Sequence, residues 1–278
     1  MRVDGECDDI TWSMLTEASW SEGDRILLLK SPNLRGDDVA ALQNRLSRLG
    51  FDCGRVDGIF GPRTVRALTE FQQNAGLTAD GVCTPEVVDM LQRIGTQSGS
   101  GPGIASVREA EVLTQAASST QRRVVIGQFG AVSHIGHAVG RLLRHRYPLT
   151  ITVDGDVHSQ AQTANSWGAE VYVGIESSTD DSCSICYYEV PTFVSVGGQS
   201  LAHRIVDAIS AHAPDIGPRA LGLRLPILRE TRMPAVLCTV GPLTTVLQQA
   251  TMIADGIVAA VDSWLAEPHV ASSGNTPT

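Results

Sequence analysis

The segment "RMPAVLCTVGPL", residues 232–243, is the clearest indication of the fold in the C-terminal half of this 278-residue chain. Its apolar run is entered through a proline and closed by glycine and proline, which is typical of a strand in the middle of a sheet. Strand ends in open α/β sheets are where functional groups are usually placed. This strand ends on Cys238 and Thr239 and presents no carboxylate. It therefore has the position of a catalytic element without an acid or base at its tip.

Strands and helices alternate around this segment. Strand-like runs are "RRVVIG", "LTITV" and "EVYVGIES", at residues 122–127, 149–153 and 170–177. Helical patterns occupy residues 137–145, 158–168, 199–212 and 244–265. The alternation predicts an α/β domain over residues 121–266, with a mainly parallel or mixed sheet covered by helices on both faces.

The N-terminal part has helical periodicity. In the first pattern, Val39, Leu42, Leu46 and Leu49 recur at steps of three and four residues, with Asp37 as the expected N-cap. A second pattern is centred on Leu68 and Phe71, and a third on Val87, Leu91 and Ile94 after the helix start Thr84-Pro85. These patterns predict a small all-α three-helix module over residues 31–94.

Composition marks the boundaries of these domains. "GTQSGSGPG" is rich in glycine and serine, so we expect a linker over residues 95–120 and a disordered tail over residues 267–278. Residues 3–15 repeat residues 79–91, with Asp4 and Asp80 lying 76 residues apart. Residues 1–20 are therefore interpreted as the remnant of a first module, expected to be poorly ordered or to lean on the second.

Charge and cysteine usage exclude several classes of function. The net charge of −9 argues against a nucleic-acid partner, and no segment approaches the roughly 20 apolar residues of a membrane span. The acidic N-terminus lacks a signal-peptide pattern, so a cytoplasmic location is expected, with the natural start left open. The pair Cys183 and Cys186 has redox or zinc spacing, but no second pair follows, so reduced thiols in a loop are expected. Cys238 is expected to be a buried packing thiol.

Residues 34–91 resemble the bacterial peptidoglycan-binding module. The resemblance lies in a Gly-x-x-Val-x-x-Leu-Gln start, in "VDGIFGPRT", in "FQ" and in a second Asp-Gly. It implies a shallow groove for muropeptides beside the turns. Candidate ligand-binding residues are Asp57, Gly58, Thr64 and Gln72, which offer backbone and short polar groups to sugar hydroxyls and peptide amides. The alternative is that the Asp-Gly turns are purely structural.

The C-terminal domain resembles the zinc-dependent N-acetylmuramoyl-L-alanine amidases. Four stretches carry the resemblance: "RRVVIGQFG", "ANSWGAEVYVGIES", "LAHRIVDAI" and "LRETRMPAVLCTVGPL". It implies zinc held by a histidine, a glutamate and a second histidine, with a glutamate on the final strand as general base. The three ligand positions are here Gly130, His134 and Glu176, and the base position is Thr239. No catalytic residue, metal or other cofactor is therefore expected.

The order of the two domains resembles the actinobacterial cytoplasmic amidase-like proteins of the CwlM type. This resemblance implies a pseudoenzyme that controls cell-wall synthesis through a peptidoglycan or muropeptide precursor and through a synthesis enzyme or regulatory protein. One alternative is an active amidase with zinc in a rearranged site of His134, His137 and Glu176. A further alternative is a purely structural, wall-anchored protein.

Overall fold

The computed structural model describes residues 7–95, 104–105, 107–109, 111, 121–130, 133–191 and 193–267. It contains two compact units, Met1–Arg108 with Pro191–Phe193 and Glu109–Val190 with Val194–Thr278. Most of the predicted linker, the start of the predicted remnant and nearly all of the predicted tail lie outside the described residues. Among the helices that are described, none combines the length and apolar composition of a membrane-spanning segment.

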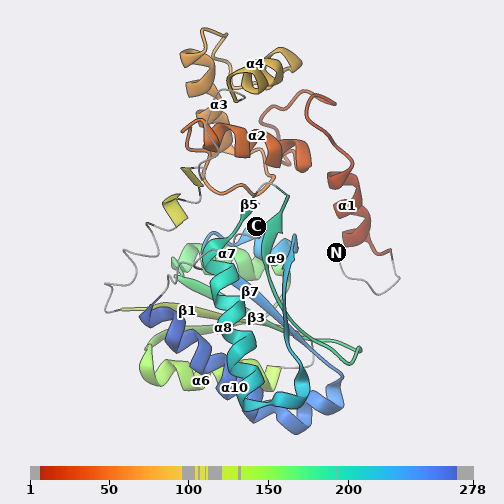
Figure 1. Ribbon diagram of the computed structural model, residues 1–278, viewed down its shortest axis with the longest axis vertical. Helices are drawn as coiled ribbons and strands as arrows, with labels where there is room; N and C mark the ends of the chain where they lie inside the picture. The colour runs from red at the N-terminus through yellow and green to blue at the C-terminus, as the bar shows by residue number, and fades with distance from the viewer. Residues whose placement is uncertain are drawn as a thin grey trace, which may run out of the picture. The chain divides into compact units, whose positions relative to one another are not determined.

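The first unit contains the predicted three-helix module. Its helices are α2 (Asp37–Arg48), α3 (Pro62–Asn74) and α4 (Pro85–Gly95) (Figure 1). The three helices share one apolar core. Leu46, Leu68 and Leu91 are each at most 1% exposed, as helical periodicity predicts. The predicted N-cap of the first of these helices is wrong by one residue. Gly36 takes that position without a side-chain bond, and Asp37 is the first helical residue.

A further helix, α1 (Asp9–Ala18), precedes the module. It begins 76 residues before α4, at the offset that the sequence repeat predicts. The two repeats differ in burial. Leu15 is 44% exposed, whereas the equivalent residue Leu91 is 1% exposed. Trp12 is also exposed, at 67%. The apolar residues that α1 shares with α4 are therefore not buried in a core of the same kind.

The second unit is built on a seven-stranded mixed sheet with the order β2-β1-β3-β7-β4-β5, and β6 pairs with β4. Strands β2, β1, β3 and β7 are parallel, and β4 runs antiparallel to β7. The mixed sheet confirms the predicted fold class, although three of its strands had no counterpart in the sequence prediction. The strands are β1 (Arg123–Phe129), β2 (Leu149–Val153), β3 (Val171–Ser177), β4 (Cys183–Val190), β5 (Phe193–Val194), β6 (Arg219–Leu223) and β7 (Ala235–Val240).

Helices cover both faces of this sheet, as predicted. Ile126, Ile175 and Cys238 belong to a core that also contains apolar residues of α6, α8 and α10. Because side chains alternate along a strand, the intervening residues face the other side, where the Tyr172 hydroxyl donates to Gln160 of α7 at 2.8 Å. Figure 1 shows α8 lying in front of the strands. The helices are α6 (Ser133–Arg146), α7 (Val157–Trp167), α8 (Val196–His212), α9 (Pro226–Glu230) and α10 (Leu243–Ala266), with a 3₁₀ turn at Pro214–Ile216.

The cysteine pair of "CSIC" lies in a strand, so its predicted loop position is wrong. Cys183 and Cys186 belong to β4 and are each 3% exposed. Three residues apart, they point to opposite faces of the sheet. Burial raises the pKa of Cys183 to about 12 and that of Cys186 to about 11. Burial likewise raises the pKa of Cys238, which confirms its prediction as a packing thiol.

Candidate functional site

Three neighbouring parallel strands bring the predicted site positions to one edge of the sheet. Phe129 at the end of β1 pairs with Glu176 of β3, and Glu176 pairs in turn with Thr239 of β7. Gly130 directly follows Phe129. Phe129, Glu176 and Thr239 therefore lie in one row, with Gly130 one residue beyond it, although more than 100 residues separate Phe129 from Thr239. The carboxyl end of parallel strands is the usual location of a site in an α/β sheet.

A pocket of about 420 Å³ lies just beyond this row. Ser177 at the end of β3 lines it together with Ser178 and Thr179, and Pro242, Leu243 and Thr244 line it after β7. The Ser178 N–H donates to the Val240 carbonyl at 2.9 Å, which ties the two walls together. A side chain at Gly241 would collide with the carbonyl oxygens of Ser178 and Asp180. The shape of the pocket therefore depends on close backbone packing that tolerates no side chain at position 241.

The lining of this pocket suits hydrogen bonding to a neutral ligand. Its six lining residues offer four hydroxyl groups and two apolar side chains, and none of the six carries an ionisable group near neutral pH. Leu243 and Thr244 open α10, whose N-cap residue makes no side-chain hydrogen bond. The first N–H groups of an α-helix have no partner within the helix, so the first turn of α10 adds backbone donors beside the hydroxyls.

The donor set at this edge does not fit a zinc ion. Catalytic zinc takes three protein ligands, and Gly130 offers no side-chain donor at the first position. Glu176 offers one carboxylate at the strand position, and His134 is an exposed residue of α6. Across all described residues, no three His, Cys, Asp or Glu side chains are grouped so that they could hold a metal ion.

His134, His137 and Glu176, the ligands of the alternative metal site, do not lie on the same face of the sheet. The Nδ1 atom of His137 lies 3.2 Å from Nε2 of Gln128, whose in-register partner Ile175 packs in the core with α6. Glu176 follows Ile175, so its side chain leaves the sheet on the other face. The structure therefore brings Glu176 to Thr239 and His137 to Gln128, and does not bring the two groups together.

In the module, a buried glutamine holds the first Asp-Gly turn. Gln43 of α2 accepts the N–H groups of Asp57 at 3.0 Å and Gly58 at 2.8 Å. Its own amide donates to the Asp57 carboxylate at 2.8 Å and to the Thr64 hydroxyl at 3.1 Å. Gln43 is 1% exposed, so its side chain is fully used inside the module.

The second Asp-Gly turn is built in the same way. Gln72 of α3 accepts the Gly81 N–H at 2.8 Å and donates to the Asp80 carboxylate at 2.9 Å and to the Val82 carbonyl at 3.0 Å. In the sequence, each glutamine directly follows an apolar residue, and an Asp-Gly pair comes further along the chain. This pattern could have identified both glutamines as the residues that hold the turns.

The predicted ligand-binding residues of the module fall into two groups. Thr64 is 2% exposed and Gln72 is 1% exposed, so their side chains shape the turns from within. Asp57 is partly exposed and is oriented by Gln43. Ligand contact stays a prediction for this set, in which Gly58 is also buried and Asp57 is the one partly exposed member.

Known proteins resemble both units of this chain. Residues 35–91 match the family model described as "Putative peptidoglycan binding domain". The chain is 31% identical, over an alignment of 300 residues, to the N-acetylmuramoyl-L-alanine amidase CwlM of Mycobacterium tuberculosis, covering 93% of this chain and 74% of that protein.

Two further known proteins are similar to parts of this chain. A spore cortex-lytic enzyme of Bacillus cereus is 46% identical over 56 residues, which make up 20% of this chain and 22% of the enzyme. The solved structure of the N-acetylmuramoyl-L-alanine amidase AmiC2 of Nostoc punctiforme superimposes with a TM-score of 0.42 at 17% identity, covering 53% of this chain and 99% of that chain.

Proposed function

Because the chain belongs to the family of the N-acetylmuramoyl-L-alanine amidase CwlM, we propose that it is a muropeptide-binding regulator of cell-wall synthesis that does not hydrolyse its ligand. In this proposal the helical module binds peptidoglycan or a muropeptide precursor. The amidase-like domain provides a second ligand pocket and a surface for a cell-wall synthesis enzyme or a regulatory protein. No resident zinc takes part.

The observation that carries the proposal is Thr239, which pairs in register with Glu176 at the tip of β7. Hydrolysis of an amide needs a group that takes a proton from water and returns it to the leaving amine. A threonine hydroxyl is not ionised near neutral pH and cannot accept that proton. Gly130, at the same edge, supplies no ligand for an ion that would lower the pKa of water.

The pocket beside this edge supports binding in place of hydrolysis. Muropeptides present sugar hydroxyls and peptide amides, which pair with the hydroxyls of Ser177, Ser178, Thr179 and Thr244. Leu243 and Pro242 give apolar contact for the sugar ring or the lactyl methyl group. Each of these groups binds a ligand without transferring a proton.

The experiment that tests the proposal measures zinc content, hydrolysis and binding on the full chain. Purified protein is analysed for metal by mass spectrometry, incubated with isolated peptidoglycan, and titrated with a soluble muropeptide. The variants are Thr239→Glu and the double variant Thr239→Glu with Gly130→His, and an active zinc amidase is the positive control. We expect wild type and Thr239→Glu to release no muropeptide, because one restored base cannot work without the metal.

Two results would contradict the proposal. About one zinc per chain with muropeptide release by the wild type would establish the active amidase with rearranged ligands. Sedimentation with insoluble peptidoglycan through the module, without binding of any soluble muropeptide, would instead indicate a wall-anchored structural protein.

A further inference from the structure

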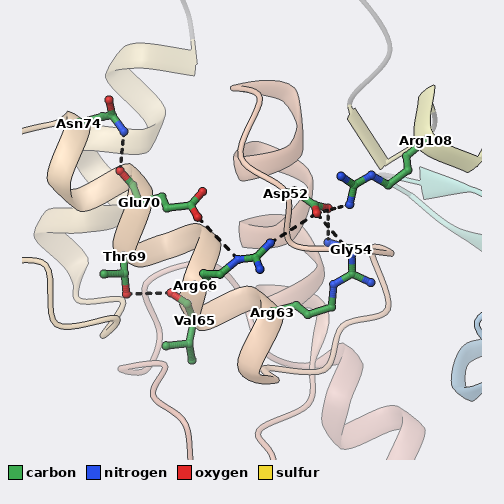
Figure 2. Close-up of polar contacts among 9 residues, drawn as sticks. All are labelled: Asp52, Gly54, Arg63, Val65, Arg66, Thr69, Glu70, Asn74 and Arg108. Carbon is green, nitrogen blue, oxygen red and sulfur yellow. Dashed lines mark hydrogen bonds and ion pairs between the residues drawn. The ribbon is translucent and has the colours of Figure 1, made fainter.

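Three arginine side chains of the first unit converge on one carboxylate. Figure 2 shows Arg63 and Arg66 of α3 and Arg108 directed toward Asp52. The Oδ2 atom of Asp52 lies 3.4 Å from Nη2 of Arg63 and 3.8 Å from Nη2 of Arg66, and it is also ion-paired with Arg108. We call Arg63, Arg66 and Arg108 the arginine cluster.

The carboxylate at the centre of the cluster is held by the backbone. Asp52 is 15% exposed, and its Oδ1 atom accepts the N–H of Gly54 at 3.0 Å. Partial burial acts to raise the pKa of Asp52, but the Gly54 N–H and Arg108 outweigh it, so the pKa lies below its usual range. Asp52 therefore remains an anion that gathers the arginines at neutral pH.

A glycine makes room for one of the three guanidinium groups. Gly54 has φ +81°, and a Cβ atom there would lie 3.0 Å from Cζ of Arg63. The Arg63 guanidinium therefore packs against bare backbone at position 54. This contact limits the orientations of a side chain that is otherwise 59% exposed.

Fold stability does not account for the cluster. Arg63, Arg66 and Arg108 are 59%, 64% and 45% exposed, and ion pairs of such exposed groups contribute little to stability. Each guanidinium has five N–H donors, far more than one carboxylate can accept. Glu70, with Oε1 3.6 Å from Nε of Arg66, still leaves three cations facing two anions. This local excess of positive charge occurs in a chain of net charge −9.

We propose that the arginine cluster binds an oxyanion of the muropeptide ligand, either a carboxylate of its stem peptide or a phosphate of a nucleotide-linked precursor. This inference rests on the proposed function and deepens it by naming the ligand group. Guanidinium groups bind carboxylate and phosphate with paired, charge-assisted hydrogen bonds. Arg63 and Arg66 lie within the residues that match the peptidoglycan-binding family.

The geometry assigns different roles to Asp52 and to the exposed ends of the three arginines. Asp52 accepts hydrogen bonds from Arg63 and Arg108 and is ion-paired with Arg66, while the exposed portions of the three side chains offer their remaining donors to solvent. An arriving oxyanion needs no proton transfer and no metal. It replaces water on donors that Asp52 has already brought together, which lowers the cost of ordering them.

The test is calorimetric titration of the full chain with four probes. These are a soluble muropeptide with free stem carboxylates, the same muropeptide with those carboxylates amidated, a uridine diphosphate-linked muropeptide and inorganic pyrophosphate. The double variant Arg63→Gln with Arg66→Gln is compared with wild type. Arg93→Gln is the matched control, because Arg93 is an exposed arginine of α4 in the same module and is not one of the three arginines of the cluster.

We expect the double variant to bind the charged probe at least about tenfold more weakly than wild type, and Arg93→Gln to bind within about twofold of it. Affinity should also fall with added salt. If amidation of the stem carboxylates abolishes binding of the muropeptide, the group bound by the cluster is the stem carboxylate. If the uridine diphosphate-linked muropeptide binds more tightly than the unlinked muropeptide and pyrophosphate also binds, the group bound by the cluster is the phosphate.

Failures of the two proposals are distinguishable. If wild type binds muropeptide and the double variant binds it equally well, the cluster proposal is wrong and the proposed function stands. If no muropeptide binds but pyrophosphate binds in an arginine-dependent manner, the cluster is an anion site and the proposed function is wrong. Absence of binding by all four probes overturns both. Amide exchange spectra matching wild type show that the variants are folded.

Discussion

Replacing the buried glutamine of the second turn tests how the module is built. In Gln72→Met, a side chain of similar volume loses the amide that accepts the Gly81 N–H and donates to Asp80 and Val82. Gly81 is buried, so its N–H is left without a partner, at a cost of about 1–3 kcal/mol. The Asp80 carboxylate is exposed and regains water, so it adds little to this loss. Loss of the bond to Val82 adds about 1 kcal/mol, for a total of about 2–4 kcal/mol.

That loss is large for a domain of this size. A module of about 60 residues has a free energy of unfolding of about 3–9 kcal/mol. Peptide-level amide hydrogen exchange on the full chain reports the module separately from the α/β unit. A loss of about 2–4 kcal/mol corresponds to exchange about 30- to 900-fold faster in peptides spanning α3 and α4.

The neighbouring residue provides the matched control. Gln73 is the same residue type on the same helix and is exposed, so Gln73→Met should change exchange by less than about threefold. If the two variants exchange alike, or if Gln72→Met accelerates exchange by less than about tenfold, the Gln72 side chain does not hold the second Asp-Gly turn.

Other predictions concern the pocket and the buried thiols. Gly241→Ala should destabilise the α/β unit by about 1–3 kcal/mol, because the new Cβ collides with the Ser178 carbonyl; an unchanged thermal unfolding midpoint would contradict this. Burial raises the pKa of Cys53 and of Cys83 to about 12, from 9.0 in the unfolded chain. As the pH rises, these thiols therefore ionise in the unfolded chain before they ionise in the folded chain. The stability that they contribute below pH 9.0 is lost as the pH rises from 9.0 toward 12, by about 1.4 kcal/mol per pH unit for each thiol. Urea titrations from about pH 8 to about pH 10.5 measure this slope. Cys53→Ala should reduce it, whereas Cys7→Ser, at an exposed thiol, should leave it unchanged.

Local periodicity was enough to predict most of the fold. The apolar spacing of Val39, Leu42 and Leu46 fixes one buried face of α2 whatever else the chain does, and all three are buried. The parallel strands β1, β3 and β7 were readable because both faces of a central strand are covered, which selects continuous apolar runs.

Strand β4 was not predicted, and the cause is its setting within the sheet. "CSICYYEV" mixes polar and apolar residues without strict alternation, so no simple period marks it as a strand. It is a strand because β7 pairs with it on one side and β6 on the other, and Cys183, Ile185 and Tyr187 are buried in a core shared with α8 and α10. A pattern along the chain does not record which strands lie beside a segment, so the sequence alone predicts a loop for these cysteines.

The chemistry available at the sheet edge was determined by the sequence. Glycine has no donor and threonine has no accessible anion in any fold, so Gly130 and Thr239 limit that edge before any coordinates are considered. Tertiary structure decided which groups meet: Gln128 beside His137, Gln72 against its turn, and the arginine cluster around Asp52. The physical reason is that ionisation and hydrogen-bonding capacity belong to a residue, whereas the distance between residues far apart in the chain is set by packing.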